Sequence, residues 1–588
     1  MIFPIPKYEK YETDIYDLKE YDSNLDLVFL FEKYKSGNAD IKVKSDVSFS
    51  EDEYTLVINE NGIEITVAYD SGLFRAITTL KQLIKQNGSH LPWCEIKDSP
   101  DFAKRSYMLD ISRGRIPKRE TIMHLIDILA ELKYNEFQLY MESFCFKYET
   151  LNEYTKDLNC LDADDIKFLD QYCADRFIDF VPNQNSFGHL YSWLNHPDFR
   201  HLAVGDDTTN TGTINPLVDE SFEFVDKLYS ALLPNYRSEY VNIGLDEAFG
   251  LGKFQLKELC ENVGADNVFM DWLNKLADHI KKKYNKKVQF WSDMVSGYPE
   301  SFERVPEGAI ALNWGYDVAE SVLLEKKCSD LESKNIPYYI CSGNSVWLAF
   351  TGRFDVCSVN FRTCAELGRK YNALGYMVTD WGNGGHPHFP VWSYLPATLG
   401  GQYAWNAGGP IDVGNLKNDF IRSSIKYVDE YIFGGAKVSE WLYRLQQYYL
   451  YEPERVHCST ICGISFNLPL GETAIEPFFD LKVCGDSFYF ENVKCYVEKC
   501  MEAVEQIEFD EVLKRQVLLN AKMVVLASEL CVIRKNQSCE STKIDVLIKL
   551  IDEIHDEFVF LWDKDNHPDG RKIFLLQLEG RRKELLEL

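Results

Sequence analysis

From Ser106 onward, the chain repeats one pattern eight times: a short apolar strand, a polar or aromatic loop and an amphipathic helix. Eight such units over roughly 300 residues predict an α/β fold of the (β/α)8 (TIM) barrel type, in which helices surround a closed parallel sheet. A doubly wound sheet is the competing arrangement, but the sequence has no Gly-x-Gly-x-x-Gly turn of the kind that fold uses for phosphates. The expected strands are Tyr107–Ile111, Glu136–Met141, Phe180–Asn185, Tyr240–Gly244, Val288–Ser292, Ala309–Trp314, Pro337–Cys341 and Gly375–Thr379.

Two further domains are expected on either side of the barrel, which we assign to residues 99–410. Residues 1–98 form a small α+β domain, because strand-like runs alternate with turns and Asn61-Gly62 is a strong hairpin signal. Residues 411–588 form a mostly helical C-terminal domain, because strand signals fade there and long helical runs dominate. The helical runs are 496–535, 543–562 and 571–588. Such a domain serves packing or oligomerisation, so a homodimer is one expected assembly.

Composition and charge narrow the range of partners. The 63 basic and 92 acidic residues give a net charge of −29, which repels phosphate backbones and anionic lipids. We therefore expect no nucleic acid and no membrane surface as a partner. The first residues lack the basic and apolar regions of a signal peptide, and the 16 cysteines follow no paired spacing. These features predict a cytoplasmic protein with reduced thiols, no bound metal and no cofactor.

The most informative motif is the run from Val241 to Glu247, where an apolar strand ends in the adjacent acids Asp246 and Glu247. A neighbouring like charge raises the pKa of one carboxyl group, and partial burial raises the pKa of both. A protonated acid beside an ionised one is what glycosidic bond cleavage requires. The alternative is that the two acids only cap the next helix, whose N-terminus favours negative charge.

Polar and aromatic residues follow all eight expected strands, at the barrel end where such folds carry their chemistry. They include Asp110 and Arg113, Glu142, His189, Asp293, Asn313, Asn344 and Asp380. A guanidinium such as that of Arg113 can hold two neighbouring hydroxyls of a sugar, or can simply pair with Asp110.

Tryptophan follows four successive strands, at positions 291, 314, 347 and 381. A single tryptophan in a barrel usually belongs to the core. Four at successive strand ends predict an aromatic box around an apolar substituent, such as an acetyl methyl group.

These motifs together resemble glycoside hydrolase family 20, the β-N-acetylhexosaminidases. The likeness covers the small domain and the whole barrel, roughly residues 1–410, and the helical C-terminal part resembles that of a bacterial subgroup. The matching pieces are Met108–Gly114, Gly188-His189, Gly244–Glu247, Phe290–Asp293, Asn313-Trp314 and Asp380–Gly382.

The resemblance implies a substrate-assisted retaining mechanism, in which the 2-acetamido oxygen of the substrate attacks the anomeric carbon and forms an oxazolinium ion. It implies that Glu247 is the general acid and base, and that Asp246 orients the amide N–H and stabilises its charge. It also implies a substrate with a terminal N-acetylhexosamine, as an oligosaccharide or glycoconjugate. The expected substrate-binding residues are Asp110, Arg113, His189, Trp291, Trp314, Trp347, Asp380 and Trp381.

The sequence departs from the family pattern at two places. After the second strand it has Glu142, which we expect to replace the acid that normally partners His189. After the seventh strand the family supplies a tyrosine for the acetamido oxygen, and here the chain has Ser345 and Trp347. Tyr316 is the candidate for that hydroxyl.

Several functional alternatives stay open. One is a relative that releases a disaccharide, such as a lacto-N-biosidase, and another is a sugar-binding protein without catalysis. A third is a metal-assisted hydrolase that uses His189, Asp246 and Asp293, although these residues lack the spacing of a metal site. The preference between gluco and galacto sugars depends on the loops around Arg113, Asp380 and Asn383.

Overall fold

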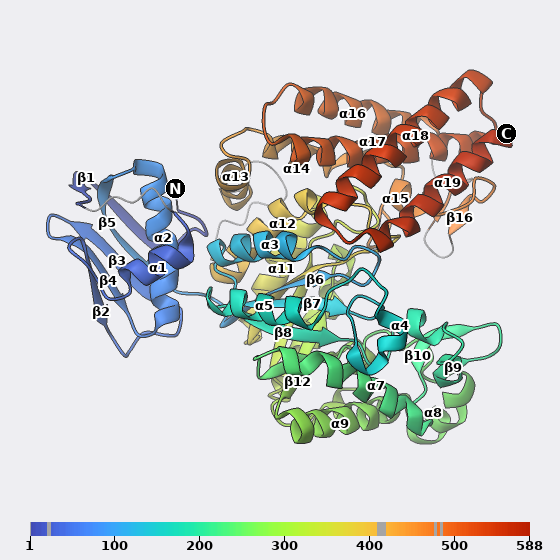
Figure 1. The fold of residues 1–588 in the computed structure, drawn as a ribbon, viewed down its shortest axis with the longest axis horizontal. Helices are drawn as coiled ribbons and strands as arrows, with labels where there is room; N and C mark the ends of the chain where they lie inside the picture. The colour runs from blue at the N-terminus through green and yellow to red at the C-terminus, as the bar shows by residue number, and fades with distance from the viewer. Residues whose placement is uncertain (1, 20–24, 409–418, 476–478, 482–485) are drawn as a thin grey trace.

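The computed structural model of the chain describes residues 2–19, 25–408, 419–475, 479–481 and 486–588. At its centre eight parallel strands form a closed barrel in the order β11-β12-β13-β14-β15-β6-β7-β8 (Figure 1). All eight predicted strands are confirmed, with the largest shift at β6, which begins at Lys104 rather than Tyr107. The strands are β6 (Lys104–Asp110), β7 (Glu136–Met141), β8 (Asp179–Gln184), β11 (Tyr240–Asn242), β12 (Lys287–Trp291), β13 (Ile310–Trp314), β14 (Tyr338–Gly343) and β15 (Gly375–Asp380).

Helices cover the outside of the barrel in all but one connection. The exception lies between β12 and β13, where only the short 3-10 helices Asp293–Val295 and Pro299–Arg304 form. Gly297, Pro299 and Pro306 interrupt that segment, so no run is long enough for an α-helix. The prediction of a helix after every strand was therefore wrong at this place. The covering helices are α3 (Arg119–Glu131), α5 (Ala163–Ala174), α7 (Asp219–Leu232), α9 (Ala265–Tyr284), α10 (Ser321–Ser333), α11 (Phe354–Lys370) and α12 (Tyr394–Trp405).

The N-terminal domain is a five-stranded sheet, in the order β1-β5-β3-β4-β2, with two helices on one face. The predicted hairpin is confirmed, since β3 and β4 pair antiparallel through the turn at Asn61. Phe177 of the barrel packs against Phe31 and Phe74 of the two helices, so the helices lie between sheet and barrel. The elements are β1 (Tyr8–Asp17), α1 (Leu27–Tyr34), β2 (Ile41–Ser45), β3 (Tyr54–Asn59), β4 (Gly62–Val67), α2 (Asp70–Asn87) and β5 (His90–Asp98).

A bundle of helices packs on the barrel at the C-terminal end of the chain (Figure 1). The predicted continuous run over 496–535 is wrong, because the helix breaks at residues 506–510. There Asp510 accepts hydrogen bonds from the N–H groups of Val512 and Leu513 and so caps a new helix. The predicted boundary at residue 410 lies outside the described residues. The main helices are α13 (Asp419–Tyr427), α14 (Ser439–Leu445), α15 (Ile461–Ser465), α16 (Phe488–Glu505), α17 (Glu511–Asn536), α18 (Ser541–Asp565) and α19 (Lys572–Leu586).

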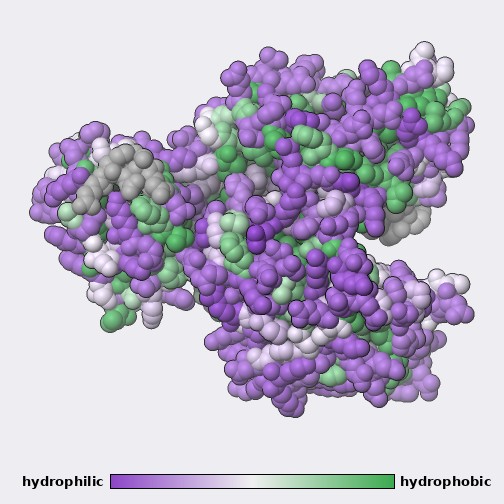
Figure 2. All heavy atoms as spheres, viewed as in Figure 1, coloured by the Kyte–Doolittle hydropathy of each residue, from purple (hydrophilic) through white to green (hydrophobic). Residues whose placement is uncertain are grey.

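Helix α17 forms the core of this bundle. Among the described residues, α17 alone is long and apolar enough to cross a membrane by length and composition. However, 89% of its apolar stretch is buried inside the structure. Figure 2 shows mostly hydrophilic residues on the viewed face of the molecule, with apolar residues gathered in patches over the C-terminal helices. The apolar length of α17 is therefore explained by packing against its neighbours.

One side chain of α17 supports the loop that follows strand β15. The buried amide of Asn520 accepts hydrogen bonds from the Phe389 N–H (3.1 Å) and from Trp392 Nε1 (2.8 Å). It also donates to the carbonyl of Pro387 (3.0 Å). The C-terminal bundle thus holds the chain segment that leads away from the barrel mouth.

We expect Asn520→Ala to lower the stability of the protein clearly. The change leaves two buried donors without an acceptor, at roughly 1–3 kcal/mol for each unsatisfied group. The midpoint of urea unfolding measures the loss. Lys522→Ala, on the same helix with a part-exposed ion pair to Glu553 (3.5 Å), is the matched control and should change the midpoint little. Equal midpoints for the wild type and Asn520→Ala would contradict this role.

Candidate active site

The turn after strand β11 holds the two adjacent acids in an unusual backbone conformation. Gly244, Leu245 and Glu247 have φ angles of 72°, 79° and 45°, and the last two are costly for residues other than glycine. The Asn185 side chain holds the turn, because its Oδ1 accepts the Leu245 N–H at 3.1 Å. A Cβ at Gly244 would lie 2.4 Å from that oxygen, so this close approach needs glycine.

Asp246 lies at the bottom of the site and is buried. Its Oδ1 accepts from Asn185 Nδ2 at 2.7 Å, and its Oδ2 lies 3.3 Å from His189 Nε2. Burial by itself would raise the pKa of Asp246, but the charge and hydrogen bond of His189, with the charge of Arg113, outweigh it. The pKa of Asp246 is therefore lowered, and this carboxylate stays ionised near neutral pH.

Glu247 is the more exposed of the two acids. Its side chain is 40% exposed, against 9% for that of Asp246. Its Oε2 lies 3.2 Å from His189 Nε2, and its backbone N–H donates to Asp293 Oδ2 at 3.0 Å. One carboxylate is thus fixed at the floor, and the other lies near the mouth.

His189 joins the two acids through a single ring nitrogen. Burial alone would lower the pKa of this imidazole, but its ion pair with Asp246 and its hydrogen bonds to Asp246 and Glu247 raise the pKa to about 10. The ring is therefore an imidazolium at neutral pH. Its loop comes close because Gly188 has no side chain, since a Cβ there would lie 2.1 Å from the Asp246 carbonyl oxygen.

Asp293 is a third acid next to the pair; it was expected at a strand end, but outside the metal alternative it was given no role. Burial is the main cause that raises its pKa to about 7, and the charge of Asp246 adds to it. Its Oδ1 accepts from Trp314 Nε1 at 3.4 Å. Asp293 therefore links the backbone of Glu247 to the aromatic wall.

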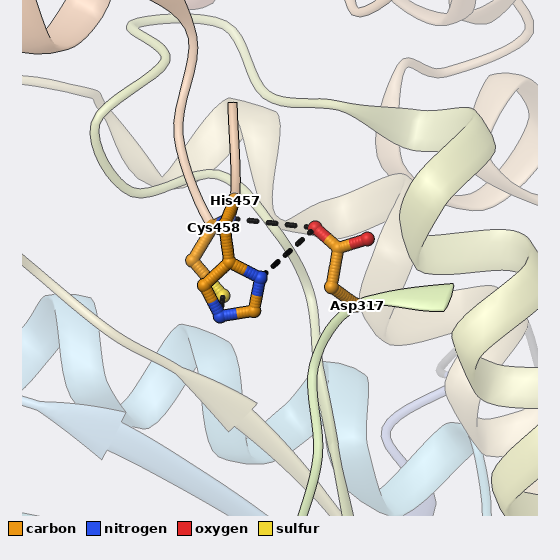
Figure 3. A group of neighbouring side chains, drawn as sticks. All are labelled: Asp317, His457 and Cys458. Atoms are coloured by element: carbon orange, nitrogen blue, oxygen red, sulfur yellow. Dashed lines mark hydrogen bonds and ion pairs between the residues drawn. The ribbon is translucent and has the colours of Figure 1, made fainter. Parts of the chain in front are cut away.

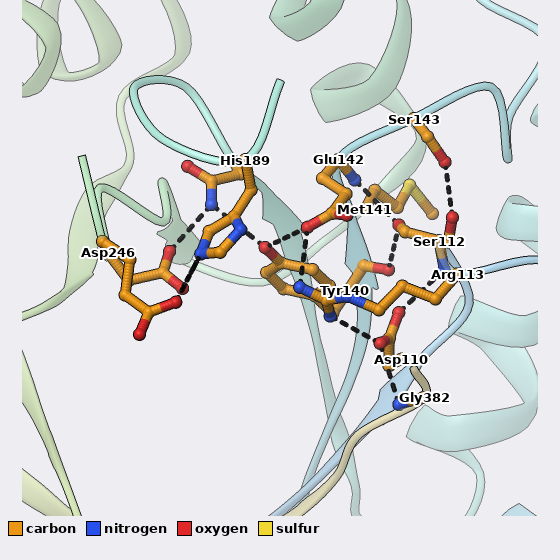
Figure 4. Close-up of polar contacts among 12 residues, drawn as sticks. Asp110, Ser112, Arg113, Tyr140, Met141, Glu142, Ser143, His189, Asp246 and Gly382 are labelled. Atoms are coloured by element: carbon orange, nitrogen blue, oxygen red, sulfur yellow. Dashed lines mark hydrogen bonds and ion pairs between the residues drawn. The ribbon is translucent and has the colours of Figure 1, made fainter. Parts of the chain in front are cut away.

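Arg113 is held by two carboxylates (Figure 4). Its Nη1 donates to Asp110 Oδ2 at 2.6 Å, and its Nη2 donates to Glu142 Oε2 at 3.1 Å. Glu142 also accepts from Tyr140 Oη at 2.7 Å. The predicted pairing of Glu142 with His189 is therefore wrong, because its hydrogen bonds go to Arg113 and Tyr140, and only a longer-range charge interaction reaches His189.

A chain of hydrogen bonds connects this pair to Asp246. Asn185 Nδ2 donates both to Tyr140 Oη (3.0 Å) and to Asp246 Oδ1 (2.7 Å). Tyr140 and Asn185 were not predicted as site residues. Asn185 is the last residue of the predicted strand Phe180–Asn185, and this position at the functional end of the barrel could have identified it as a site residue.

Two of the predicted substrate-binding residues lie behind the pocket wall. Asp110 is buried under Arg113 and accepts the Gly382 N–H at 2.9 Å. Asp380 is also buried, and its Oδ2 accepts from Tyr107 Oη at 2.8 Å. Neither carboxylate is among the residues that line the pocket, so their role in substrate binding stays a prediction.

The four predicted tryptophans come together with Tyr316 in one wall. Tyr316 stacks on Trp314 with ring centroids 5.1 Å apart, and Trp347 packs edge-on at 5.5 Å. Trp381 lies 5.9 Å from Trp291, and its Nε1 donates to Tyr316 Oη at 2.9 Å. These rings form a box with one hydroxyl in it, beside the ionised Asp246.

The pocket has a volume of about 320 Å³, near the lower end of small-molecule sites, which span roughly 300–1,000 Å³. One side of it comes from the C-terminal region, which sequence reasoning missed. The lining residues are Arg113, His189, Asp246, Glu247, Trp291, Trp314, Tyr316, Trp347, Leu348, Trp381, Asn383, His457, Cys458, Ser459 and Ile464.

Among the residues that the structure describes, two groups of side chains bring potential metal ligands within 4.8 Å of one another. The first is Asp317 with His457 and Cys458, at the pocket rim. The second is Asp380 with His386 and His388, fully buried behind the wall. In the buried group, burial and the charge of Arg115 lower the pKa of both imidazoles, and the same charge opposes a cation.

Comparison with known proteins defines the class of this fold and site. The model of the catalytic domain of glycosyl hydrolase family 20 matches residues 102–358, and the model of domain 2 of that family matches residues 17–99. The two matches together span more than half of the chain. The protein therefore belongs to glycoside hydrolase family 20.

The relatives are distant. A beta-hexosaminidase of Vibrio furnissii is 23% identical over 322 residues, which cover 49% of this chain and about half (52%) of that protein. The structure of a Flavobacterium johnsoniae chitobiase covers 99% of this chain and 98% of its own, with a TM-score of 0.59 and 15% identity. The structure of an exo beta-N-acetylglucosaminidase of Vibrio harveyi in complex with N-acetylglucosamine covers 73% of this chain and 76% of its own. Its TM-score is 0.56, and its sequence identity is 19%. These two structural likenesses establish the fold.

The raised pKa of His189 predicts a pH dependence of stability. Because the folded pKa is raised from 6.5 to about 10, the contribution of His189 is fully present below pH 6.5 and is lost as pH rises through about 10. We expect the gap in urea midpoint between the wild type and His189→Gln to shrink over that range. His196→Gln, at a part-exposed histidine beside Asp198, is the control. A gap that stays constant across this pH range would contradict the ion pair with Asp246.

Proposed function

We propose that the protein is an exo-acting β-N-acetylhexosaminidase, which removes terminal β-linked N-acetylglucosamine or N-acetylgalactosamine by substrate-assisted catalysis. The observation that carries this proposal is that an ionised Asp246 lies beside Glu247, next to the box of aromatic rings that contains the Tyr316 hydroxyl. Membership of family 20 supports the reaction class. A box of aromatic rings suits the apolar methyl of an acetyl group, and an adjacent fixed anion suits the amide N–H that becomes positively charged.

The proposed reaction uses the two acids in different roles. The acetamido oxygen of the substrate attacks the anomeric carbon while Glu247 gives its proton to the glycosidic oxygen, and the alcohol leaves. Asp246 accepts the amide N–H and stabilises the positive charge of the oxazolinium ion. Water then attacks the anomeric carbon as Glu247 takes its proton, which restores the acid and gives net retention.

The remaining side chains bind and position the sugar. Arg113 presents N–H groups to the hydroxyls of the terminal sugar, and Asp110 and Glu142 fix its direction. Tyr316 takes the acetamido oxygen, because its own oxygen accepts from Trp381 and leaves the hydroxyl proton to donate. His189 holds both acids and is a positioning residue.

The natural substrate stays a proposal that rests on sequence. We propose short oligosaccharides or glycoconjugates with a terminal N-acetylhexosamine, handled in the cytoplasm, with a homodimer as the assembly. A relative that releases disaccharides is the second candidate, and the ratio of rates on mono- and disaccharide aryl glycosides separates the two. A binding protein without catalysis would bind the sugar in calorimetry and release no product.

We expect the wild type to release the aryl group from aryl N-acetyl-β-hexosaminides and to leave the matching glycosides without an acetamido group intact. Glu247→Gln should lower kcat by about 10²–10⁴-fold, because the general acid is lost. Asp246→Asn should lower it by about 10²–10³-fold, because the fixed anion is lost. Asp271→Asn, an exposed acid on α9, is the matched control. Full activity of Glu247→Gln, with folding unchanged, would overturn these roles.

Tyr316→Phe should lower kcat more than it raises KM, since the hydroxyl stabilises the acetamido oxygen mostly as it becomes the nucleophile. A loss of at least about tenfold is expected. Tyr298→Phe, an exposed tyrosine after β12, serves as the control. If Tyr316→Phe behaves like that control, another group binds the acetamido oxygen.

A further inference from the structure

One side of the pocket is made by a segment far from the barrel in sequence. His457, Cys458 and Ser459 line the same cavity as Asp246 and Glu247, and they belong to the loop before α15. The carbonyl of Leu348, in the loop after β14, accepts the Thr460 N–H at 3.2 Å. The segment therefore lies over the barrel loops that carry the aromatic box.

Hydrogen bonds and ion pairs fix this segment to the rim (Figure 3). Asp317 Oδ2 accepts the Cys458 N–H at 3.4 Å and lies 3.9 Å from His457 Nδ1. Glu320 Oε1 lies 3.6 Å from His457 Nε2. Both ring nitrogens thus lie near carboxylates of one short barrel helix, Val318–Glu320, and its N-cap, but beyond hydrogen-bonding distance, and Nε2 also lies 3.5 Å from Cys458 Sγ.

One of these carboxylates, that of Glu320, also holds the backbone of the aromatic wall, and the other pairs with Arg353. Glu320 Oε2 accepts the N–H groups of Tyr316 (2.8 Å) and Asp317 (3.0 Å). Arg353 Nη1 donates to Asp317 Oδ2 at 3.3 Å. These carboxylate oxygens already accept several hydrogen bonds, and the guanidinium of Arg353 lies beside them. We therefore infer that Asp317, His457 and Cys458 hold the loop before α15 in place and do not form a cation site.

The exposure of the lining residues shows which part of the substrate His457 can reach. Tyr316 and Trp347 are 7% and 4% exposed and form the floor that takes the acetamido group. The side chains of Glu247 and His457 are 40% and 45% exposed and lie at the mouth. Glu247 must touch the glycosidic oxygen, so the leaving saccharide extends past the mouth.

We propose that His457 binds the leaving saccharide, so that the C-terminal region forms a subsite for the sugar next to the cleaved bond. This inference rests on the proposed hydrolase function. Asp317 is the positioning residue, since it accepts the Cys458 N–H and lies 3.9 Å from a ring nitrogen of His457. A small aromatic leaving group has no hydroxyl for the ring to bind, whereas a sugar presents several.

The test compares two substrates for the wild type and His457→Ala. One is 4-nitrophenyl N-acetyl-β-glucosaminide, and the other is a disaccharide of β-linked N-acetylglucosamine. We expect His457→Ala to lower kcat/KM about tenfold for the disaccharide, mostly through KM, and to stay within about twofold for the aryl glycoside. Asp317→Asn should also lower kcat/KM for the disaccharide and not for the aryl glycoside, but by a smaller factor. His555→Ala, on exposed helix α18, should leave both rates unchanged.

Two results would overturn the subsite. One is an equal loss on both substrates, which indicates general damage to the pocket, and the other is no loss on either. If the wild type cleaves neither substrate, the proposed function fails on its own. Calorimetric binding of the disaccharide then decides the subsite, and equal affinity of wild type and His457→Ala would refute it.

Discussion

The rest of the site depends on one imidazolium, that of His189, which lies between two neighbouring acidic side chains. Asp246 and Glu247 are neighbours in the chain, and His189 Nε2 lies 3.3 Å from a carboxyl oxygen of the first and 3.2 Å from one of the second. The cost of this arrangement includes two positive φ angles at Leu245 and Glu247, which the surrounding loops hold in place. The two acids therefore differ in their surroundings: Asp246 is buried and ionised, whereas Glu247 lies at the mouth of the pocket, where the proposed reaction places the leaving group.

The three parts of the chain act on this site to different degrees. The barrel supplies the acids, Arg113 and the aromatic box. The C-terminal bundle supports the loop after β15 through Asn520 and lines the pocket through His457. In the N-terminal domain, Asp52 pairs with Arg105 of the barrel at 2.5 Å, away from the mouth. The bundle is therefore part of the proposed binding site, whereas the sheet domain only abuts the barrel.

The barrel and the core of the site could be predicted because they depend on local patterns. Strand periodicity and the residues that follow each strand located Asp246, Glu247 and the tryptophans. No α-helix forms after β12 because Gly297, Pro299 and Pro306 interrupt that segment. The prediction did not consider the combined effect of these three residues. The contact between Asp317 and Cys458 spans 141 positions and depends on how the bundle packs, so no local pattern reveals it.

A crystal structure with a bound N-acetylglucosamine thiazoline, an analogue of the oxazolinium ion, tests the central claim most directly. The account predicts the methyl group inside the box of Trp291, Trp314 and Trp381, the ring nitrogen within hydrogen-bonding distance of Asp246, and Glu247 beside the anomeric carbon. A complex in which Asp246 does not contact the ring nitrogen, or in which Glu247 points away from the anomeric carbon, would contradict it.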